Sequence, residues 1–331
     1  MGGSVRIAVD DIRKAERTIA GKVLRTPCVA SAGLAAALGC QVVLKLEVLQ
    51  LAGCFKPRGI VNKVQSLSDA ERRQGIVTVS GGNHGIAMAM MARRMGLAAT
   101  IVMPQAAPER SKARIRADGA NLIVAPDVTA AFEVAEAERA KGLTYIHAFD
   151  DPLIIAGHGT LGLELIADAP DLTDVLVSIG GGALISGIAT AIKAVKPAVR
   201  VWGVETEGAD AMTQALAAGR PVPIKVTSIS STLGAPYATE RTLAHVQELV
   251  ERVFVVSDAE AVAGVVTLAE EARVWVEPAA GCLVPAARQV VRHDGPDAVL
   301  GLVLCGGNAS MQDTMRWVER FGVLNAAGAA P

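Results

Sequence analysis

A lysine between a phenylalanine and a proline could do covalent chemistry. Lys56 stands between Phe55 and Pro57, and glycines occupy positions 53 and 59. Partial burial disfavours the charged ammonium and lowers the pKa of a lysine, as an amine that forms a Schiff base requires. A basic turn residue whose ammonium reaches water is the alternative interpretation. The segment alone is therefore compatible with a Schiff-base lysine but does not require one.

Two glycine-rich segments could bind an anion. Residues 80–85 read Ser-Gly-Gly-Asn-His-Gly, and residues 178–187 read Ser-Ile-Gly-Gly-Gly-Ala-Leu-Ile-Ser-Gly. Each follows an expected strand and precedes an expected helix, where glycines let a ligand approach the backbone and unpaired N–H groups attract negative charge. The second segment lacks the lysine of a Walker loop and has Ile185 where a dinucleotide fingerprint needs its third glycine. These features indicate a compact monophosphate as the ligand.

Three polar side chains could orient a ligand near these loops. Asn83 offers a side-chain amide, although an asparagine in such a turn can also serve only as a helix cap. Cys305 ends the last expected strand, and its neutral thiol could face the nitrogen of a heteroaromatic ring; a buried strand cysteine is the alternative. Glu277 begins a segment that reads Glu-Pro-Ala-Ala-Gly and would by itself be a surface acid. Only the joint occurrence of these segments at strand ends is specific.

The elements that position these residues alternate along the chain. Short apolar runs are followed by amphipathic stretches, which predicts parallel sheets with right-handed helical crossovers. Ligands of such open α/β sheets bind beyond the carboxyl ends of the strands, where the glycine-rich segments lie. The expected strands cover residues 42–46, 76–80, 100–103, 121–124, 174–179, 199–204, 253–256 and 298–305, and the expected helices include 85–95, 108–118, 128–141 and 186–196.

Composition and charge exclude several classes of protein. The 331 residues carry 32 Lys and Arg against 33 Asp and Glu, and 51% of the residues are hydrophobic. A net charge of −1 provides no electrostatic footprint for nucleic acid or an anionic membrane, and the apolar content is too high for a disordered chain. Five cysteines without a CxxC pair indicate neither a disulfide framework nor a zinc ribbon. Because neither a signal peptide nor a membrane span is expected, we predict a cytoplasmic protein.

Taken together, these segments resemble the pyridoxal-phosphate enzymes of the tryptophan-synthase-β fold, within the family of serine/threonine dehydratases and serine racemases. The family patterns Ser-Phe-Lys-x-Arg-Gly and Ser-x-Gly-Asn-His-Gly are similar to residues 54–59 and 80–85. Its tetraglycine loop, Glu-Pro-x-Ala-Gly and Ser-Gly-Gly-Asn are similar to residues 180–183, 277–281 and 305–308. The resemblance covers nearly the whole chain. It implies an α/β, two-lobed tryptophan synthase β-like fold with open, mostly parallel sheets and flanking helices.

The resemblance also implies a role for each matching residue. Lys56 would hold pyridoxal 5'-phosphate as a Schiff base and then act as the catalytic base at the substrate Cα. Asn83 would hydrogen-bond the cofactor's 3-hydroxyl group, and Cys305 would face its pyridine nitrogen. The other cofactor-binding residues would be Phe55, Glu277 and, through the backbone amides that hold the phosphate, Gly180, Gly181, Gly182 and Ala183. The substrate would be bound by Ser80, Gly81, Gly82, Asn83 and His84.

The implied reaction is β-elimination from L-threonine or L-serine, which yields a 2-oxo acid and ammonia. Hydroxyaspartate or another β-hydroxy amino acid is the alternative substrate. A serine racemase is disfavoured, because racemases of the family carry at the position of Gly81 a serine that reprotonates the opposite face of Cα. The Lys-Pro-Arg context of Lys56 disfavours a β-replacement synthase, and the presence of Lys56 disfavours a non-catalytic ligand-binding relative.

Several positions depart from the family pattern. Cys54 and Cys305 replace serines, Ala183 replaces a loop glycine, and Thr232 stands near a usual glycine in a segment that would border the cofactor. Both cysteines keep a weak hydrogen-bond donor, and Ala183 keeps its N–H group, whereas Thr232 leaves the shape of the pocket in its segment undetermined.

A divalent cation is the second cofactor that the resemblance suggests. Mg²⁺ could be held by Glu205, the carbonyl of Ala209 and Asp210, although Ala211 stands where a second family carboxylate is often found. A solvated strand end is the alternative interpretation of Glu205.

The same analogy predicts the organisation of the chain. A small lobe of residues 75–148 would be inserted into a large cofactor-binding lobe of residues 1–74 and 149–322, and residues 323–331 would form a frayed tail. The expected partners are an amino-acid substrate and a second copy of the chain in a homodimer, with no nucleic acid and no membrane.

Overall fold

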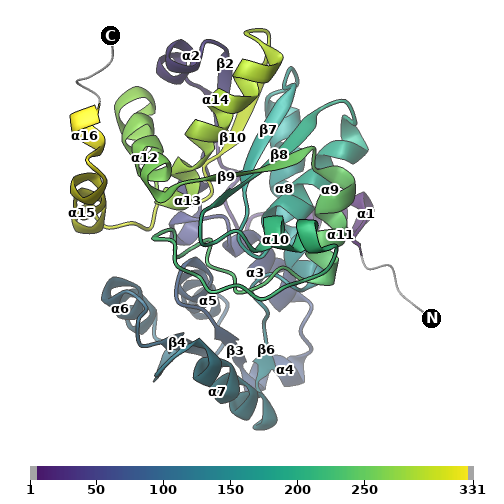
Figure 1. Ribbon diagram of the computed structural model, residues 1–331. Helices are drawn as coiled ribbons and strands as arrows, with labels where there is room; N and C mark the ends of the chain where they lie inside the picture. The colour runs from purple at the N-terminus through teal and green to yellow at the C-terminus, as the bar shows by residue number, and fades with distance from the viewer. Residues whose placement is uncertain (1–5, 327–331) are drawn as a thin grey trace.

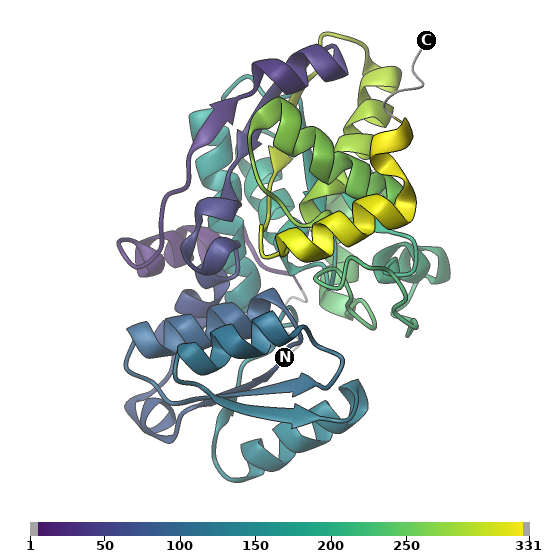
Figure 2. The same ribbon diagram turned by 90° about the vertical axis from the view of Figure 1, so that its left-hand side faces the viewer.

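The computed structural model describes residues 6–326, which form two separate sheets, each flanked by helices (Figure 1). The smaller sheet and its helices occupy the lower part of the molecule in both views, and the larger sheet occupies the upper part (Figure 2). The fold is therefore the predicted α/β architecture of two open, mostly parallel sheets with flanking helices.

The larger sheet has six strands, and all neighbouring pairs are parallel except β1 with β2. Its central strand β7 is buried along its whole length, as expected for an apolar strand covered on both faces. The strands in spatial order are β1 (Cys28–Ala30), β2 (Gln41–Lys45), β10 (Val299–Val303), β7 (Asp174–Ser178), β8 (Arg200–Thr206) and β9 (Arg252–Val256). The covering helices include α8 (Pro152–Asp168) and α9 (Ala183–Val195) on one side and α12 (Asp258–Ala272) and α14 (Leu283–Asp294) on the other (Figure 1).

The smaller sheet has four strands, all parallel. Its strands in spatial order are β5 (Asn121–Ala125), β4 (Ala99–Pro104), β3 (Ile76–Val79) and β6 (Thr144–Tyr145). Its helices are α5 (Asn83–Arg94), α6 (Glu109–Ala117) and α7 (Val128–Ala140). The remaining elements are α1 (Val9–Ile19), α2 (Ala32–Leu38), η1 (Glu47–Leu49), η2 (Leu51–Gly53), α3 (Pro57–Gln65), α4 (Asp69–Gln74), α10 (Ala211–Ala218), α11 (Glu240–Leu249), α13 (Pro278–Gly281), α15 (Met311–Phe321) and α16 (Val323–Ala326).

The eight expected strands and four expected helices are all present, with ends displaced by a few residues at most. Strands β1 and β6 were not predicted; they contain only three and two residues and lie at the edges of their sheets. Such short edge strands contain too few residues to show a hydrophobic period. They form because a longer neighbouring strand supplies the hydrogen-bonding partner.

The smaller sheet is built only from strands between residues 76 and 145, whereas β2 and β10, far apart in sequence, are neighbours in the larger sheet. This topology agrees with an inserted unit, and the lobe boundaries at residues 75 and 148 stay a prediction.

The predicted frayed tail begins too early. Val323–Ala326 forms helix α16, because Gly322 ends α15 with a φ of 63° and lets the chain turn into a further helical turn. Residues 327–331 of that prediction lie outside the described residues. Within residues 6–326, no helix is both long and apolar enough to cross a bilayer.

Candidate active site

Lys56 lies at the start of helix α3, in a cavity between the two sheets. It is the N-cap residue of α3, and Pro57 occupies the first helical position. The Nζ atom donates a hydrogen bond of 2.9 Å to the carbonyl of Ala148 and lies 5.0 Å from the centre of the Phe55 ring. Burial lowers the pKa of Lys56 to about 8. With this pKa, roughly a tenth of the amine is neutral at pH 7, and only the neutral form can act as a nucleophile or base.

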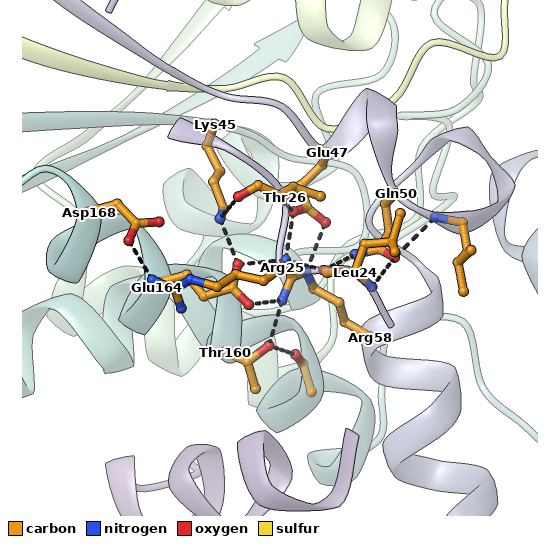
Figure 3. Close-up of polar contacts among 12 residues, drawn as sticks. Leu24, Arg25, Thr26, Lys45, Glu47, Gln50, Arg58, Thr160, Glu164 and Asp168 are labelled. Atoms are coloured by element: carbon orange, nitrogen blue, oxygen red, sulfur yellow. Dashed lines mark hydrogen bonds and ion pairs between the residues drawn. The ribbon is translucent and has the colours of Figure 1, made fainter. Parts of the chain in front are cut away.

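A buried ion network anchors the first turn of α3 (Figure 3). Arg58 is fully buried and forms two paired hydrogen-bond contacts, one with each of two carboxylates. Its Nε and Nη2 atoms donate to Glu47 at 2.8 Å each, and its Nη1 and Nη2 atoms donate to Glu164 at 2.7 and 2.8 Å. Lys45 adds a second cation, 2.6 Å from Glu164. Two cations thus face two anions, and Lys56 is held two residues from a rigid anchor.

Close backbone contact fixes the same turn against helix α8. A Cβ atom on Gly59 would lie 2.8 Å from the carbonyl oxygen of Ile154, and one on Gly157 would lie 2.5 Å from that of Arg58. Only glycines allow this approach of the two helices. The start of α3 therefore cannot shift along α8 without a clash.

The loop between β7 and α9 faces the same cavity. Gly180, Gly181, Gly182 and Ala183 line it together with Phe149. A Cβ atom on Gly181 would lie 2.2 Å from the Phe149 ring, and Gly182 has a φ of 91°. The first N–H groups of a helix have no partner within the helix, so the start of α9 offers donors to an anion. The predicted phosphate loop therefore lies beside Lys56.

Asn83 and Glu277 meet on another wall of the cavity. The Asn83 Nδ2 atom donates to the Glu277 carboxylate at 2.7 Å, and the Asn83 Oδ1 atom accepts from Asn308 at 2.6 Å. Thr232 also donates to Glu277, at 3.0 Å. Burial raises the pKa of Glu277, although these donors oppose the rise. Glu277 is thus a buried acceptor that orients its neighbours, and not the surface acid that its isolated motif suggested.

Cys305 lines the cavity at the end of β10, as the sequence predicted. Its Sγ atom lies 3.4 Å from the Oγ atom of Ser178. Burial raises the pKa of Cys305 to about 12, and it does the same for Cys54. Both thiols are therefore neutral, so Cys305 offers a ring nitrogen a neutral polar partner.

The expected substrate loop at residues 80–85 is only partly at the surface of this site. Asn83 lines the cavity, and Gly81 and Gly82 line an adjoining groove between the two sheets. Ser80 and His84 line neither hollow; the Ser80 hydroxyl accepts from the Gly82 N–H at 3.3 Å. Burial keeps the pKa of His84 well below its usual value, so this imidazole is neutral. The substrate roles of these residues stay predictions.

The residues predicted to hold Mg²⁺ do not fit a cation. One carboxylate oxygen of Glu205 accepts from the N–H of Met212 at 2.9 Å, and the other accepts from the N–H and hydroxyl of Thr213 at 2.8 and 2.7 Å. Asp210 instead receives a hydrogen bond from Gln214. Among residues 6–326, no cluster of three or more His, Cys, Asp or Glu side chains is arranged to hold a metal ion. Glu205 thus stabilises the start of α10.

One cavity residue had no signal in the sequence: Phe149 lines the cavity through long-range packing alone. Ser178 and Ala279 belong to the glycine-rich segment 178–187 and the segment 277–281, and Leu233 follows Thr232 in the segment expected to border the cofactor. Arg114 is likewise new: it donates to the Asn308 side chain from helix α6 and so joins the smaller sheet's helices to this wall.

Comparison with known proteins agrees with this arrangement. The family model described as "Pyridoxal-phosphate dependent enzyme" matches residues 19–306. The L-threonine ammonia-lyase of Thermotoga maritima is 36% identical over 317 residues, which cover 95% of this chain and 79% of that protein. The solved structure of a threonine deaminase from T.th. is 35% identical with a TM-score of 0.86 and covers 92% and 99% of the two chains. The structure of maize serine racemase is 32% identical with a TM-score of 0.87 and covers 97% and 99%.

Proposed function

Because the chain belongs to the pyridoxal-phosphate-dependent enzymes, we propose that it is an ammonia-lyase that converts L-threonine or L-serine to a 2-oxo acid and ammonia. The observation that carries this proposal is the partly neutral amine of Lys56 in one cavity with an anion-binding loop and a neutral thiol. The relatives include both threonine ammonia-lyases and serine racemases, so the choice between elimination and racemisation rests on this chain's own residues.

The residues around the cavity fit pyridoxal phosphate. Gly180 to Ala183 form a cradle without large side chains, and the start of α9 offers N–H donors to a phosphate. Lys56 provides the amine, and Cys305 provides a neutral partner for a ring nitrogen. Because Asn83 already pairs with Glu277 and Asn308, its proposed bond to a ring hydroxyl would need its amide to share or exchange these partners.

When bound, pyridoxal phosphate supplies an electron sink that stabilises negative charge at the substrate Cα. Lys56 in its neutral form can accept the Cα proton at Nζ, and the carbonyl of Ala148 orients this amine. The Cys305 thiol, unlike an aspartate, provides no negative charge that would hold a proton on a ring nitrogen. This arrangement thereby favours prompt loss of a β-leaving group over prolonged accumulation of negative charge at the substrate Cα.

Hydroxyaspartate or another β-hydroxy amino acid remains the alternative substrate. We expect release of a 2-oxo acid from L-serine and L-threonine, measured with a keto-acid assay over a panel of β-hydroxy amino acids. Activity confined to hydroxyaspartate would select the alternative, and no 2-oxo acid from any member of the panel would refute the lyase. A homodimer and a cytoplasmic location stay predictions.

The residue at position 81 tests elimination against racemisation. A Cβ atom on Gly81 would lie 3.6 Å from Ala107 and 3.8 Å from Pro104, so a serine fits there. A positioned general acid contributes about 10²–10⁴-fold, and we therefore expect Gly81→Ser to raise D-serine formation relative to elimination by about 10²-fold. Gly81→Ala, which adds only the Cβ, is the control. If the unaltered chain already racemises L-serine as fast as it eliminates, the proposed lyase is wrong.

The pKa of Lys56 can be tested through cofactor uptake. Only the neutral amine forms a Schiff base, so the rate of covalent uptake by the cofactor-free chain should rise with pH and level off with a midpoint near 8. An unperturbed lysine would give a midpoint near about 10.4. Visible absorbance follows the uptake, and borohydride reduction locates the modified lysine. A midpoint above about pH 10 would contradict the desolvated environment of Lys56.

A further inference from the structure

Two neighbouring hollows share one wall. The first is the cavity that contains Lys56, and the second is the groove between the two sheets that contains Gly81 and Gly82. Asn83, Thr232 and Glu277 border both. Asn83 and Glu277 are buried, whereas Thr232 is exposed. Thr232 is thus the member of this wall that a molecule in the groove can reach.

Thr232 is held in place by the turn that carries it. The N–H of Ile229 and the hydroxyl of Ser228 donate to the Asp258 carboxylate at the start of α12, at 3.0 and 2.5 Å. The N–H of Leu233 donates to the Ser230 carbonyl at 2.8 Å. At its own end, the Thr232 hydroxyl donates to Glu277 at 3.0 Å. These hydrogen bonds fix the turn and the Thr232 hydroxyl, and so they favour one orientation of the Thr232 side chain.

The methyl group of Thr232 faces Gly82. Its Cγ2 atom lies 3.3 Å from the position that a Cβ atom on Gly82 would occupy, so the methyl group faces the glycine loop at close range. The hydroxyl and the methyl group therefore do different things: the hydroxyl pairs with Glu277, and the methyl group narrows the space beside Gly82.

We infer that Thr232 is a specificity-determining residue whose methyl group limits the size of the substituent on the substrate β-carbon. This inference rests on the proposed function, in which the Cα proton goes to Lys56 and the substrate lies against residues 81–83. Because Asn83 belongs to the wall that both hollows share, the β-substituent of a substrate so placed would lie near Thr232. Serine and threonine carry small substituents, whereas a β-phenyl group would meet the Thr232 methyl group.

The test compares two substrates across matched variants. We measure the ratio of kcat/KM for L-threo-3-phenylserine to kcat/KM for L-serine. One methylene or methyl group in a binding pocket changes such a ratio by about 10–200-fold. Thr232→Ser keeps the hydroxyl and removes the methyl group, and we expect it to raise the ratio about 10-fold or more. Thr232→Val keeps the shape and removes the hydroxyl, and we expect its ratio to stay near that of the unaltered chain.

The neighbouring Ser231 provides the control. It lies in the same turn and lines the groove but not the cavity, so Ser231→Ala should not change the ratio. An unchanged ratio in Thr232→Ser, or an equal change in Thr232→Val or Ser231→Ala, would overturn the inference. If L-serine yields 2-oxo acid while the ratio does not move, only the role of Thr232 fails; if no substrate yields 2-oxo acid, the proposed function fails instead.

Discussion

Replacement of Lys56 by alanine is expected to reduce the release of 2-oxo acid by about 10³-fold or more. A general base alone contributes about 10²–10⁴-fold to a reaction, and this lysine would also be the covalent anchor of the cofactor. Among the described residues that line the cavity, Lys56 is the one lysine, and its Nζ atom is oriented by the carbonyl of Ala148. The measurement is a keto-acid assay with saturating L-serine and added pyridoxal phosphate.

A second lysine of the same helix serves as the control. Lys63 pairs with Asp151 at 2.7 Å, two turns beyond Lys56, and lines neither hollow. Lys63→Ala should retain most of the rate, and borohydride should trap the cofactor on Lys56 alone. A Lys56→Ala variant with more than a few per cent of the rate, or a trapped peptide that contains a different lysine, would contradict the assignment.

Replacement of Arg58 by methionine is expected to lower the free energy of unfolding by about 3–5 kcal/mol, because removal of one partner leaves buried charges uncompensated. Without Arg58, Glu164 would keep its ion pair with Lys45, whereas Glu47 would lose its ion pair and keep the hydrogen bond from Thr26. Both carboxylates are buried, so water cannot replace the lost guanidinium. Urea unfolding followed by circular dichroism measures the change. An exposed pair provides the contrast: Arg139→Met, which removes the partner of Glu136, should cost no more than about 1 kcal/mol.

Arg58→Lys separates charge from geometry in this network. A lysine keeps the positive charge but cannot form paired contacts with both carboxylates. We therefore expect a loss of stability between that of Arg139→Met and that of Arg58→Met. If Arg58→Met does not fold, Arg58→Lys carries the comparison. A loss in Arg58→Lys no greater than in Arg139→Met would show that the network contributes little to the stability of α3.

The features that the sequence predicted well are those that depend on neighbouring residues. The phosphate loop was predicted because its glycines, the preceding strand β7 and the following helix α9 are consecutive in the chain. Lys56 was singled out because Phe55, Pro57 and the flanking glycines restrict it locally, and the family resemblance then implied its role. The short edge strands β1 and β6 were missed, because they contain too few residues to show a hydrophobic pattern. Their extended conformation depends on pairing with β2 and β3.

The contacts that only the tertiary structure could decide connect distant residues. Asn83 and Glu277 are 194 residues apart, and so are Arg114 and Asn308, yet each pair forms a hydrogen bond at the wall of the cavity. Glu205 was a candidate metal ligand until the fold placed the start of α10 against it.

The sequence by itself thus determined the α/β architecture and the family, and it predicted which residues would form a Schiff base and bind a phosphate. Hydrophobic period, glycine placement and local spacing are encoded along the chain. The tertiary structure decided which polar groups satisfy one another and where Thr232 meets Gly82. The physical reason is that a buried polar group must find a hydrogen-bond partner, and the fold alone determines which group is within reach.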